Sequence, residues 1–283
     1  MKKVLVTGAG GFIGGNIVRG LNGKCEVIKT IHSNKRSADG IVFDWACRDD
    51  LEEKADIIIH AAALNPSHGR TFSDYYSQNV KMAEHIMSYA ERCDAERIVY
   101  LGAVSSFGIV EGVLNEDTPH VKPDDYGLSK WISEKLIIEG QVPTTVLILP
   151  GVVGQGSRPT WLTSTARKMV IDEAVGFYNG NGYFNNVLWI EDLVRFVEKV
   201  VSESSEAENE RYLLGTQNES ITVLETLIYL KEKLSSNSDL VEGNSNTKGF
   251  YLDISRAMER GFTPSPLKEI LDEVCKNANC QER

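Results

Sequence analysis

The chain has 283 residues, of which 42% are hydrophobic and 25% charged, and this balance indicates a folded globular protein rather than a disordered or collagen-like one. Its 40 acidic and 30 basic side chains give a net charge of -10, which argues against broad electrostatic binding to nucleic acid or to an anionic membrane. Glycines interrupt the N-terminal apolar run MKKVLVTGAGG early, so we predict no signal peptide and no membrane helix, and we expect a cytoplasmic protein. The five cysteines are scattered without ligand spacing, so we predict neither a disulfide framework nor a metal site.

Short apolar runs alternate with segments of helical period over the first half of the chain. Strands are predicted at residues 4–7, 27–31, 57–61, 98–101 and 145–149, and helices at residues 12–21, 75–92 and 126–139. Short apolar strands that are separated by helices are typical of a parallel sheet covered on both faces. The sequence therefore predicts an α/β fold with a doubly wound parallel sheet.

The pattern becomes less regular after Pro150. Further helices are predicted at residues 161–174, 190–202, 224–234 and 266–275, and polar loops at residues 202–210 and 235–247. We expect residues 1–150 to form the sheet domain, to which residues 186–215 return. Residues 151–185 and 216–283 are expected to form a small C-terminal lobe.

A glycine-rich turn joins the first predicted strand to the first predicted helix and reads TGAGGFIG over residues 7–14. One glycine allows a tight turn, one lets the backbone approach a pyrophosphate, and one lets the helix pack closely against the strand. Because the turn follows a strand and precedes a helix, it predicts a dinucleotide site rather than an ordinary glycine-rich loop. The expected contacts in this turn are Gly8, Gly11, Phe12, Ile13 and Gly14.

The residues that follow the second predicted strand indicate which dinucleotide is expected. An NAD site usually places a carboxylate there, about 20 residues after the glycines, to bind the ribose 2′-hydroxyl. No acid stands between this strand and Asp39, and the segment instead reads His32, Ser33, Asn34, Lys35 and Arg36. Two cations beside small polar groups suit a 2′-phosphate, so we expect NADP(H) as the cofactor, with NAD as the less favoured alternative. A solvated loop that is basic by chance is the other interpretation.

Tyr126 and Lys130 stand four residues apart in a predicted helix, which brings their side chains to one face about 5–6 Å apart. A free phenol has a pKa near 10, and lowering it toward 7 takes roughly 4 kcal/mol, which a nearby cation can partly supply. The pair therefore indicates a general acid/base, although the same spacing also occurs by chance on helix surfaces.

In combination, these features resemble the extended short-chain dehydrogenase/reductase family, in particular its nucleotide-sugar epimerases, dehydratases and reductases. The resemblance extends over roughly the first 200 residues and rests on the glycine turn, His60-Ala61-Ala62-Ala63 after a strand, Asn79, Tyr126-x-x-x-Lys130 and Pro150-Gly151. It implies a Rossmann-type fold in which Tyr126 is the general acid/base, and Lys130 holds the nicotinamide ribose and lowers the pKa of Tyr126. The further cofactor contacts that it implies are Asp44, Trp45, Ala61, Ala62, Ala63, Asn79, Pro150, Val152 and Val153.

One departure from the family pattern concerns a catalytic hydroxyl. The family usually carries Ser or Thr five residues before the glycine that corresponds to Gly108, and Ala103 stands there instead. Ser105 lies two residues further along a segment expected to be extended, so it would point to the same face and polarise the substrate oxygen. The alternative is that Ser105 and Ser106 only bond to backbone.

A second departure concerns the substrate. Where sugar-nucleotide enzymes often carry an arginine for the diphosphate, the segment at residues 184–192 has asparagine. Arg158, Arg167 or Lys168 could supply a cation instead, and a substrate without a diphosphate is the alternative. His68 and His120 are interpreted as solvated loop residues, and the alternative is that one of them serves as a second acid. The expected substrate contacts are Ser105, Ser106, Arg158, Trp161 and Tyr183. The alternative for the two aromatic side chains is a place in the core of the lobe.

We therefore predict an NADP(H)-dependent reductase of a keto group, with a nucleotide-linked 4-keto-6-deoxy sugar as substrate and Tyr126 as the proton donor. One alternative is a nucleotide-sugar epimerase or dehydratase that retains NAD. A second alternative is a non-catalytic NADP-binding regulatory protein. The resemblance also implies a homodimer formed through the predicted helices at residues 75–92 and 126–139.

Overall fold

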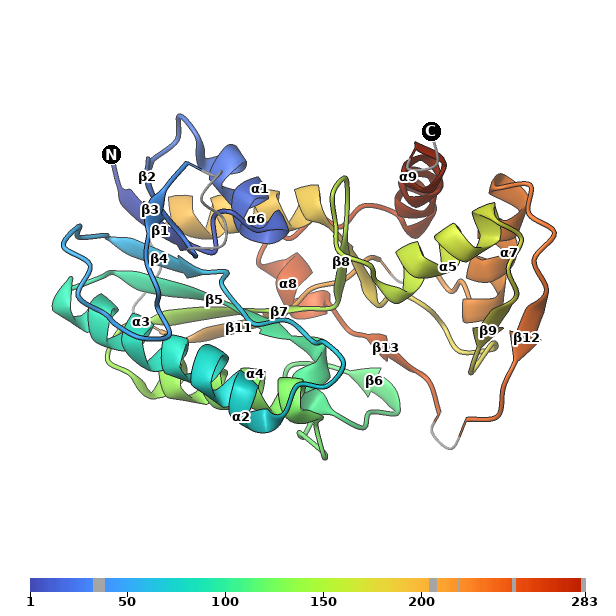
Figure 1. Ribbon diagram of the computed structural model, residues 1–283, viewed down its shortest axis with the longest axis horizontal. Helices are drawn as coiled ribbons and strands as arrows, with labels where there is room; N and C mark the ends of the chain where they lie inside the picture. Colours follow the sequence, from blue (N-terminus) through green and yellow to red (C-terminus); the bar gives the residue numbers. More distant parts are fainter. Residues whose placement is uncertain (33–38, 204–207, 218, 246–247, 281–283) are drawn as a thin grey trace. The chain divides into compact units, whose positions relative to one another are not determined.

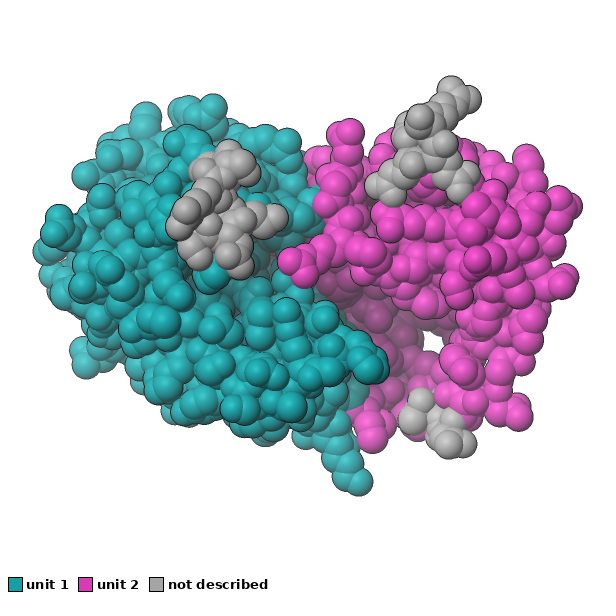
Figure 2. Space-filling model, in the orientation of Figure 1, with its two compact units in different colours: residues 1–108, 119–149, 194–212 teal, residues 109–118, 150–193, 213–283 magenta. Residues whose placement is uncertain are grey.

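The computed structural model describes residues 1–32, 39–203, 208–217, 219–245 and 248–280 (Figure 1). The chain divides into two compact units (Figure 2). The first unit comprises Met1–Gly108, Pro119–Leu149 and Val194–Tyr212, and the second comprises Ile109–Thr118, Pro150–Leu193 and Leu213–Arg283. The short excursion of Ile109–Thr118 into the second unit is a feature that the sequence pattern did not indicate.

Within the described residues, seven strands form the sheet of the first unit, in the order β11-β7-β5-β4-β1-β2-β3. Their bounds are β1 (Lys3–Thr7), β2 (Glu26–Ile31), β3 (Ile41–Val42), β4 (Ile57–His60), β5 (Arg97–Ala103), β7 (Thr144–Leu149) and β11 (Glu210–Leu213). Each neighbouring pair from β7 to β3 in this order runs parallel. The order reverses between β1 and β4, which defines the point where a doubly wound sheet binds its ligand. The predicted α/β fold is confirmed.

The central strands are apolar because both of their faces are covered. Val4, Leu5 and Val6 of β1 have no exposed surface, and neither do Ile58 and Ile59 of β4. Such strands carry continuous apolar runs rather than an alternating pattern, and this made them recognisable in the sequence. The sheet therefore provides a rigid base for the residues at its carboxyl edge.

Helices cover both faces of this sheet (Figure 1). On one face α3 (Lys81–Arg92) packs beside α4 (Asp125–Glu139), and α3 is preceded by α2 (Phe72–Tyr75) and a π-helical turn at Tyr76–Val80. On the other face α1 (Phe12–Leu21) and α6 (Ile190–Ser202) lie so close that a Cβ atom on Gly20 would be 2.3 Å from Val194 Cγ1. The single helix predicted at residues 75–92 is therefore two α-helical segments joined by a π-helical turn.

The second unit combines short parallel strand pairs with helices. Its strand pairs are β6 (Gly112–Leu114) with β13 (Phe250–Leu252), β8 (Gly151–Val153) with β10 (Val187–Trp189), and β9 (Val175–Phe177) with β12 (Leu240–Glu242). Its helices include α5 (Trp161–Val170), α7 (Val223–Lys233), α8 (Ser255–Glu259) and α9 (Leu267–Cys280). Leu162, Leu227 and Leu271 bring α5, α7 and α9 into one buried cluster. The predicted loop at residues 235–247 contains strand β12, whose partner β9 is distant in sequence.

None of the helices in the described part of the chain is long and apolar enough to span a bilayer. Nowhere in the described ranges do three or more His, Cys, Asp or Glu side chains come together in an arrangement that could hold a metal ion.

Candidate functional site

The glycine turn between β1 and α1 forms a cradle that side chains would fill. Gly8 has a φ of 66°, and a Cβ atom there would lie 2.9 Å from the backbone of Ala62. A Cβ atom on Gly14 would lie 2.3 Å from the carbonyl oxygen of Gly8. Gly11 caps α1 without a side-chain hydrogen bond, and the first turn of α1 contains no acid. The helix N-terminus therefore presents its N–H groups to an anion, and the cradle fits the pyrophosphate of a dinucleotide.

The carboxyl ends of β1 and β4 are joined by a buried hydrogen-bonded group. Thr7 Oγ1 accepts a hydrogen bond of 3.0 Å from the N–H of Ala62 and lies 2.9 Å from His60 Nδ1. His60 is 2% exposed, and its burial lowers its pKa to about 3, with the Lys130 charge acting in the same direction. The imidazole is therefore neutral and fixes the strand ends, from which the predicted cofactor contacts Ala61, Ala62 and Ala63 follow.

Tyr126 and Lys130 lie one turn apart on α4, as their spacing predicted. Lys130 is only 4% exposed, and its Nζ lies 4.2 Å from the centre of the Tyr100 ring on β5. Burial lowers the pKa of Lys130 to about 7, and the Glu134 carboxylate opposes this shift. The half-buried ring of Tyr126 meets the ring of Tyr75 edge-on at 5.7 Å. The first unit thus holds a buried amine one helical turn from a phenol, which is an arrangement suited to proton transfer.

Asn79 ties α4 to the segment that follows β4. Its Nδ2 donates to Ser129 Oγ at 3.0 Å and to the carbonyl of Leu64, and its Oδ1 accepts from the N–H of Leu64 at 2.7 Å. Ser129 Oγ in turn donates to the carbonyl of Tyr126 at 2.7 Å. The Asn79 amide therefore positions the segment predicted to meet the cofactor, and its own contact with the cofactor stays a prediction.

The segment after β5 differs from the expected extended conformation. Val104–Phe107 is a 3-10 turn, so Ser105 does not continue the face of Ala103, because residues two apart on such a helix point in different directions. Ser105 is exposed and Ser106 is fully buried. Within the described part of the chain the Ser106 hydroxyl has no hydrogen-bond partner, so the alternative of a backbone bond is wrong for Ser106. The α4 backbone reaches this turn closely, since a Cβ atom on Gly127 would lie 2.2 Å from the Ser105 carbonyl oxygen.

His120 is packed between aromatic rings, although the sequence predicted a solvated loop residue. Its ring is stacked between the rings of Phe107 and Trp131, each at 4.6 Å between centroids, and its Nδ1 lies 2.7 Å from the Ser106 carbonyl oxygen. Burial lowers its pKa, with the Ser106 carbonyl opposing the shift. The interpretation of His120 as a solvated loop residue is wrong, because the stacking partners come from elements distant in sequence. His120 instead holds the turn that carries Ser105.

Sequence reasoning missed the ion pair beneath Lys130. Glu134 is 1% exposed, and its Oε1 lies 2.8 Å from an Nη of Arg211 on β11. Glu134 follows Lys130 by four residues on α4, and this spacing was a signal that could have pointed to it. Arg211 carried no such signal, because β11 reaches α4 only through the folded sheet.

The predicted adenine and ribose contacts are only partly described. Trp45 is 3% exposed, its Nε1 donates to Thr30 Oγ1 at 2.9 Å, and Asp44 Oδ1 accepts from the N–H of Ala46 at 3.0 Å. His32 follows β2 and is exposed. The remaining predicted contacts of this segment lie outside the described residues, namely Ser33, Asn34, Lys35 and Arg36.

The other predicted contacts belong to the second unit. Trp161 begins α5 and is 42% exposed, and Tyr183 is 47% exposed. Arg158 is exposed in the loop before α5, and Val152 and Val153 lie in β8, directly after Pro150. Asn185, in the segment where the sequence has asparagine in place of an expected diphosphate arginine, is 1% exposed and exchanges hydrogen bonds of 2.8 Å with both backbone groups of Leu252. Both polar groups of this amide are therefore occupied by hydrogen bonds to β13.

The doubly wound sheet, the glycine cradle and the Tyr126–Lys130 pair define an enzyme of the extended short-chain dehydrogenase/reductase type with a pyridine nucleotide cofactor. Residues 4–215 match the model of the NAD dependent epimerase/dehydratase family, and the chain belongs to this family.

Known relatives agree with this assignment over nearly the whole chain. The chain is 24% identical to the low-salt glycan biosynthesis protein Agl12 of Haloferax volcanii, with 92% of this chain and 93% of that protein covered. It is also 24% identical to YtcB of Bacillus subtilis, described as an uncharacterized UDP-glucose epimerase, with 91% of each covered. The structure of UDP-glucuronic acid 4-epimerase from Bacillus cereus in complex with NAD shares the fold, with a TM-score of 0.84, 20% identity, and 99% and 100% of the two chains covered. These findings favour the epimerase or dehydratase alternative over a keto reductase.

Proposed function

We propose that this protein is an NAD-dependent epimerase of nucleotide sugars that keeps its cofactor bound through the reaction. The observation that carries the proposal is the pairing of Tyr126 with the buried Lys130 on α4, in the same unit as the glycine cradle of α1. The descriptions of relatives as UDP-sugar epimerases support the choice of substrate class. Because an epimerase returns the hydride that it removes, no net oxidation accompanies the reaction.

Tyr126 moves the proton in this proposal. When bound, the nicotinamide supplies the hydride acceptor and donor. The phenolic oxygen of Tyr126 takes the proton from a substrate hydroxyl as the carbinol carbon is oxidised, and it returns that proton when the carbonyl is reduced from the opposite face. A phenol can do both near neutral pH only if its phenolate is stabilised, and Lys130 on the next turn is the cation that does this.

The side chain of Lys130 is held by the Tyr100 ring and by the charge of Glu134. Its amine packs on the Tyr100 ring, 4.2 Å from the ring centre, and the buried Glu134 carboxylate supports its protonated form from the next turn of α4. In low-dielectric surroundings each of these interactions is stronger than in water. Lys130 would also hold the nicotinamide ribose, as in the family that the chain resembles.

Ser105 does not share the face of Ala103, but it supplies the hydroxyl that contacts the substrate oxygen in this proposal. It is exposed on the 3-10 turn that Phe107, His120 and Gly127 hold in place. A Ser105→Ala substitution is expected to lower turnover at least about tenfold, because a hydrogen bond to developing charge is lost. A loss below about threefold would show that Ser105 does not contact the reacting oxygen.

The substrate contacts in the second unit are proposed from their exposure. Trp161 and Tyr183 present large aromatic surfaces that can stack on a base or a sugar ring. Arg158 supplies a cation near Trp161 in sequence. NAD-binding residues proposed for the first unit are those of the glycine cradle and the strand ends described above.

An NADP(H)-dependent keto reductase is the second candidate, and the sequence after β2 favours it. Lys35 and Arg36 follow this strand without an intervening acid, which suits a 2′-phosphate. The nucleotide released from the purified protein by denaturation, together with product analysis, separates the two candidates. Released NAD and interconversion of UDP-glucose with its epimer, without added cofactor, support the epimerase. Stoichiometric consumption of NADPH with a keto sugar, and no epimer, would replace it with the reductase.

A further inference from the structure

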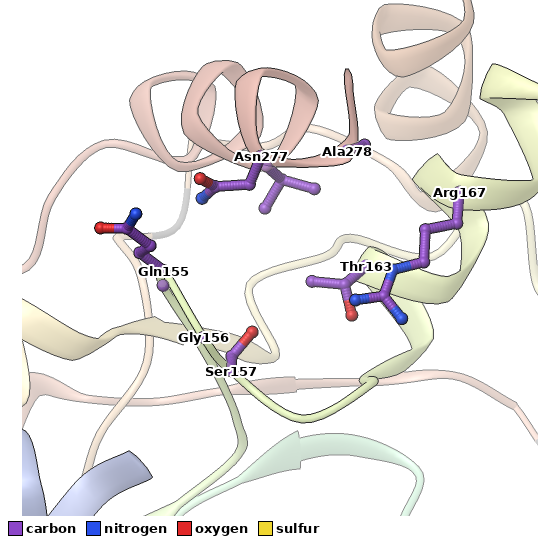
Figure 3. A pocket seen from close by; sticks show the side chains of 9 residues that line it. Gln155, Gly156, Ser157, Thr163, Arg167, Asn277 and Ala278 are labelled. Atoms are coloured by element: carbon purple, nitrogen blue, oxygen red, sulfur yellow. The ribbon is translucent and has the colours of Figure 1, made fainter. Parts of the chain in front are cut away.

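A polar pocket lies within the second unit (Figure 3). It has a volume of about 220 Å³ and is enclosed by the loop after β8, one side of α5 and the end of α9. The loop turns sharply at Gly156, whose φ of 81° favours glycine, and no side chain intrudes there. Its polar lining residues are Gln155, Ser157, Thr163, Arg167 and Asn277.

Arg167 brings the charge of this pocket. Among the described residues its guanidinium group makes no hydrogen bond and no ion pair, and no carboxylate lines the pocket. Figure 3 shows this group extending from α5 toward the pocket, while Gln155 and Asn277 bring amide groups from the loop and from α9. Within the same described ranges the side chains of Gln155, Ser157 and Asn277 have no hydrogen-bond partner either.

The pocket is therefore rich in hydrogen-bond donors, while the two amide oxygens and the Ser157 hydroxyl can also accept. A guanidinium offers a planar fork of N–H groups, each amide adds an NH₂ group, and Ser157 adds a hydroxyl. Thr163 is different, because its hydroxyl is already engaged with Thr160 in the cap of α5. Planar, bidentate donation is the geometry that matches the oxygens of a phosphate.

A purely structural role accounts less well for Arg167. A cation in the last turn of a helix interacts favourably with the helix dipole, and both Arg167 and Lys168 occupy that turn of α5. Lys168 does so while exposed, whereas Arg167 is half-buried against α9. The described residues leave the hydrogen-bonding groups of Arg167 unused, so a ligand in the pocket can take them up.

We propose that this pocket binds a phosphate group through Arg167, with Gln155, Ser157 and Asn277 as further donors. The phosphate can belong to the nucleoside diphosphate of the substrate, which would rest on the proposed function, or to a separate phosphorylated ligand. The first source would explain why Asn185 can be committed to β13 while a cation for the diphosphate is still available. The pocket is smaller than a typical site for a whole nucleotide, so it suits a phosphate group alone.

Calorimetric titration with inorganic pyrophosphate tests the proposal. The protein is saturated with NAD, so that the cradle of α1 cannot take the probe. Arg167→Gln is expected to weaken binding at least about tenfold, because hydrogen bonds to a charged partner are lost. Lys168→Gln removes the same charge from the exposed side of the same turn and is the matched control, expected to bind within about twofold of the wild type.

Asn277→Asp provides a second variant, because it places a carboxylate in the pocket and leaves Arg167 intact. It is expected to abolish pyrophosphate binding without lowering the thermal unfolding midpoint. The proposal is overturned if the wild type binds no pyrophosphate at millimolar concentration, or if Arg167→Gln and Lys168→Gln bind it equally.

Competition with UDP identifies the source of the phosphate. If saturating UDP displaces pyrophosphate from the wild type, the pocket receives the diphosphate of the substrate. If both bind together, the pocket serves a separate phosphorylated ligand. Either result supports the phosphate site, and because binding is measured without turnover, failure of the proposed epimerase reaction would be seen separately.

Discussion

Replacement of Lys130 with methionine is expected to stabilise the protein while it removes activity. Lys130 is 4% exposed, and burial lowers its pKa from 10.5 to about 7. The difference between these values corresponds to about 4–5 kcal/mol at 1.36 kcal/mol per pKa unit. This is the upper bound of the free energy that the folded protein loses by burying the amine. Methionine has a similar length and no charge, so it fills the same space without that loss.

The effect depends on pH in a defined direction. The unfolded chain binds the lysine proton more tightly than the folded protein does. Burial of Lys130 therefore lowers the unfolding free energy of the wild type by its full amount below about pH 7, and by nothing above about pH 10.5. The unfolding free energy of Lys130→Met should therefore exceed that of the wild type by up to about 4 kcal/mol at pH 7 and by about 2 kcal/mol at pH 9. A gain that declines as the pH rises is the signature of a buried amine.

Urea unfolding of the NAD-free proteins at the two pH values measures this difference. Trp45 and Trp131 report on the first unit when Trp161 and Trp189 of the second unit are replaced with phenylalanine. A Lys168→Met variant in the same background removes an exposed lysine and should change stability little at either pH. If Lys130→Met gives the same change at pH 7 and pH 9, or destabilises the protein at both, the reasoning about Lys130 is refuted.

Further substitutions test the other parts of the site. Tyr126→Phe should lower kcat by about 10²–10⁴-fold with NAD binding unchanged in calorimetry, and substantial residual turnover would exclude Tyr126 as the acid/base. Gly8→Ala should abolish NAD binding, because a Cβ atom would lie 2.9 Å from the Ala62 backbone at a φ of 66°, and binding like the wild type would contradict the cradle. Glu134→Gln should lower the unfolding free energy by about 1–3 kcal/mol in urea titrations, since the carboxylate charge that faces the 24% exposed Arg211 is removed. A Glu134→Leu/Arg211→Met double variant should recover most of that loss, and no recovery would contradict the ion-pair explanation.

The fold was predictable where local sequence and burial agree. The runs around Val4–Val6 and Ile57–Ile59 are apolar on both faces, and the glycines at positions 8, 11 and 14 mark the turn from the first of these strands into α1. The short pair β6 and β13 could not be predicted, because Gly112 and Phe250 are brought together only by the fold. Short strands that pair across such separations carry little local pattern.

The parts of the site that depend on local sequence spacing were predictable, and the parts that depend on tertiary contacts were not. The spacing of Tyr126 and Lys130 identified the pair on one helix face. Their surroundings depend on tertiary contacts, since Tyr100 reaches Lys130 from β5 and Arg211 reaches Glu134 from β11. The conformation of the turn at Ser105 also depends on packing, because α4 approaches it more closely than a side chain at Gly127 would allow.

The central claim is that a retained NAD and Tyr126 epimerise a nucleotide sugar, and NMR of the reaction in D₂O tests it most directly. The purified protein, without added cofactor, is incubated with UDP-hexoses. We predict that an epimer appears with the original hydrogen still on the inverted carbon, because the hydride returns from the nicotinamide rather than from solvent, and that Tyr126→Phe forms none. Deuterium at the inverted carbon, or the absence of any epimer from protein that carries bound NAD, would contradict the account.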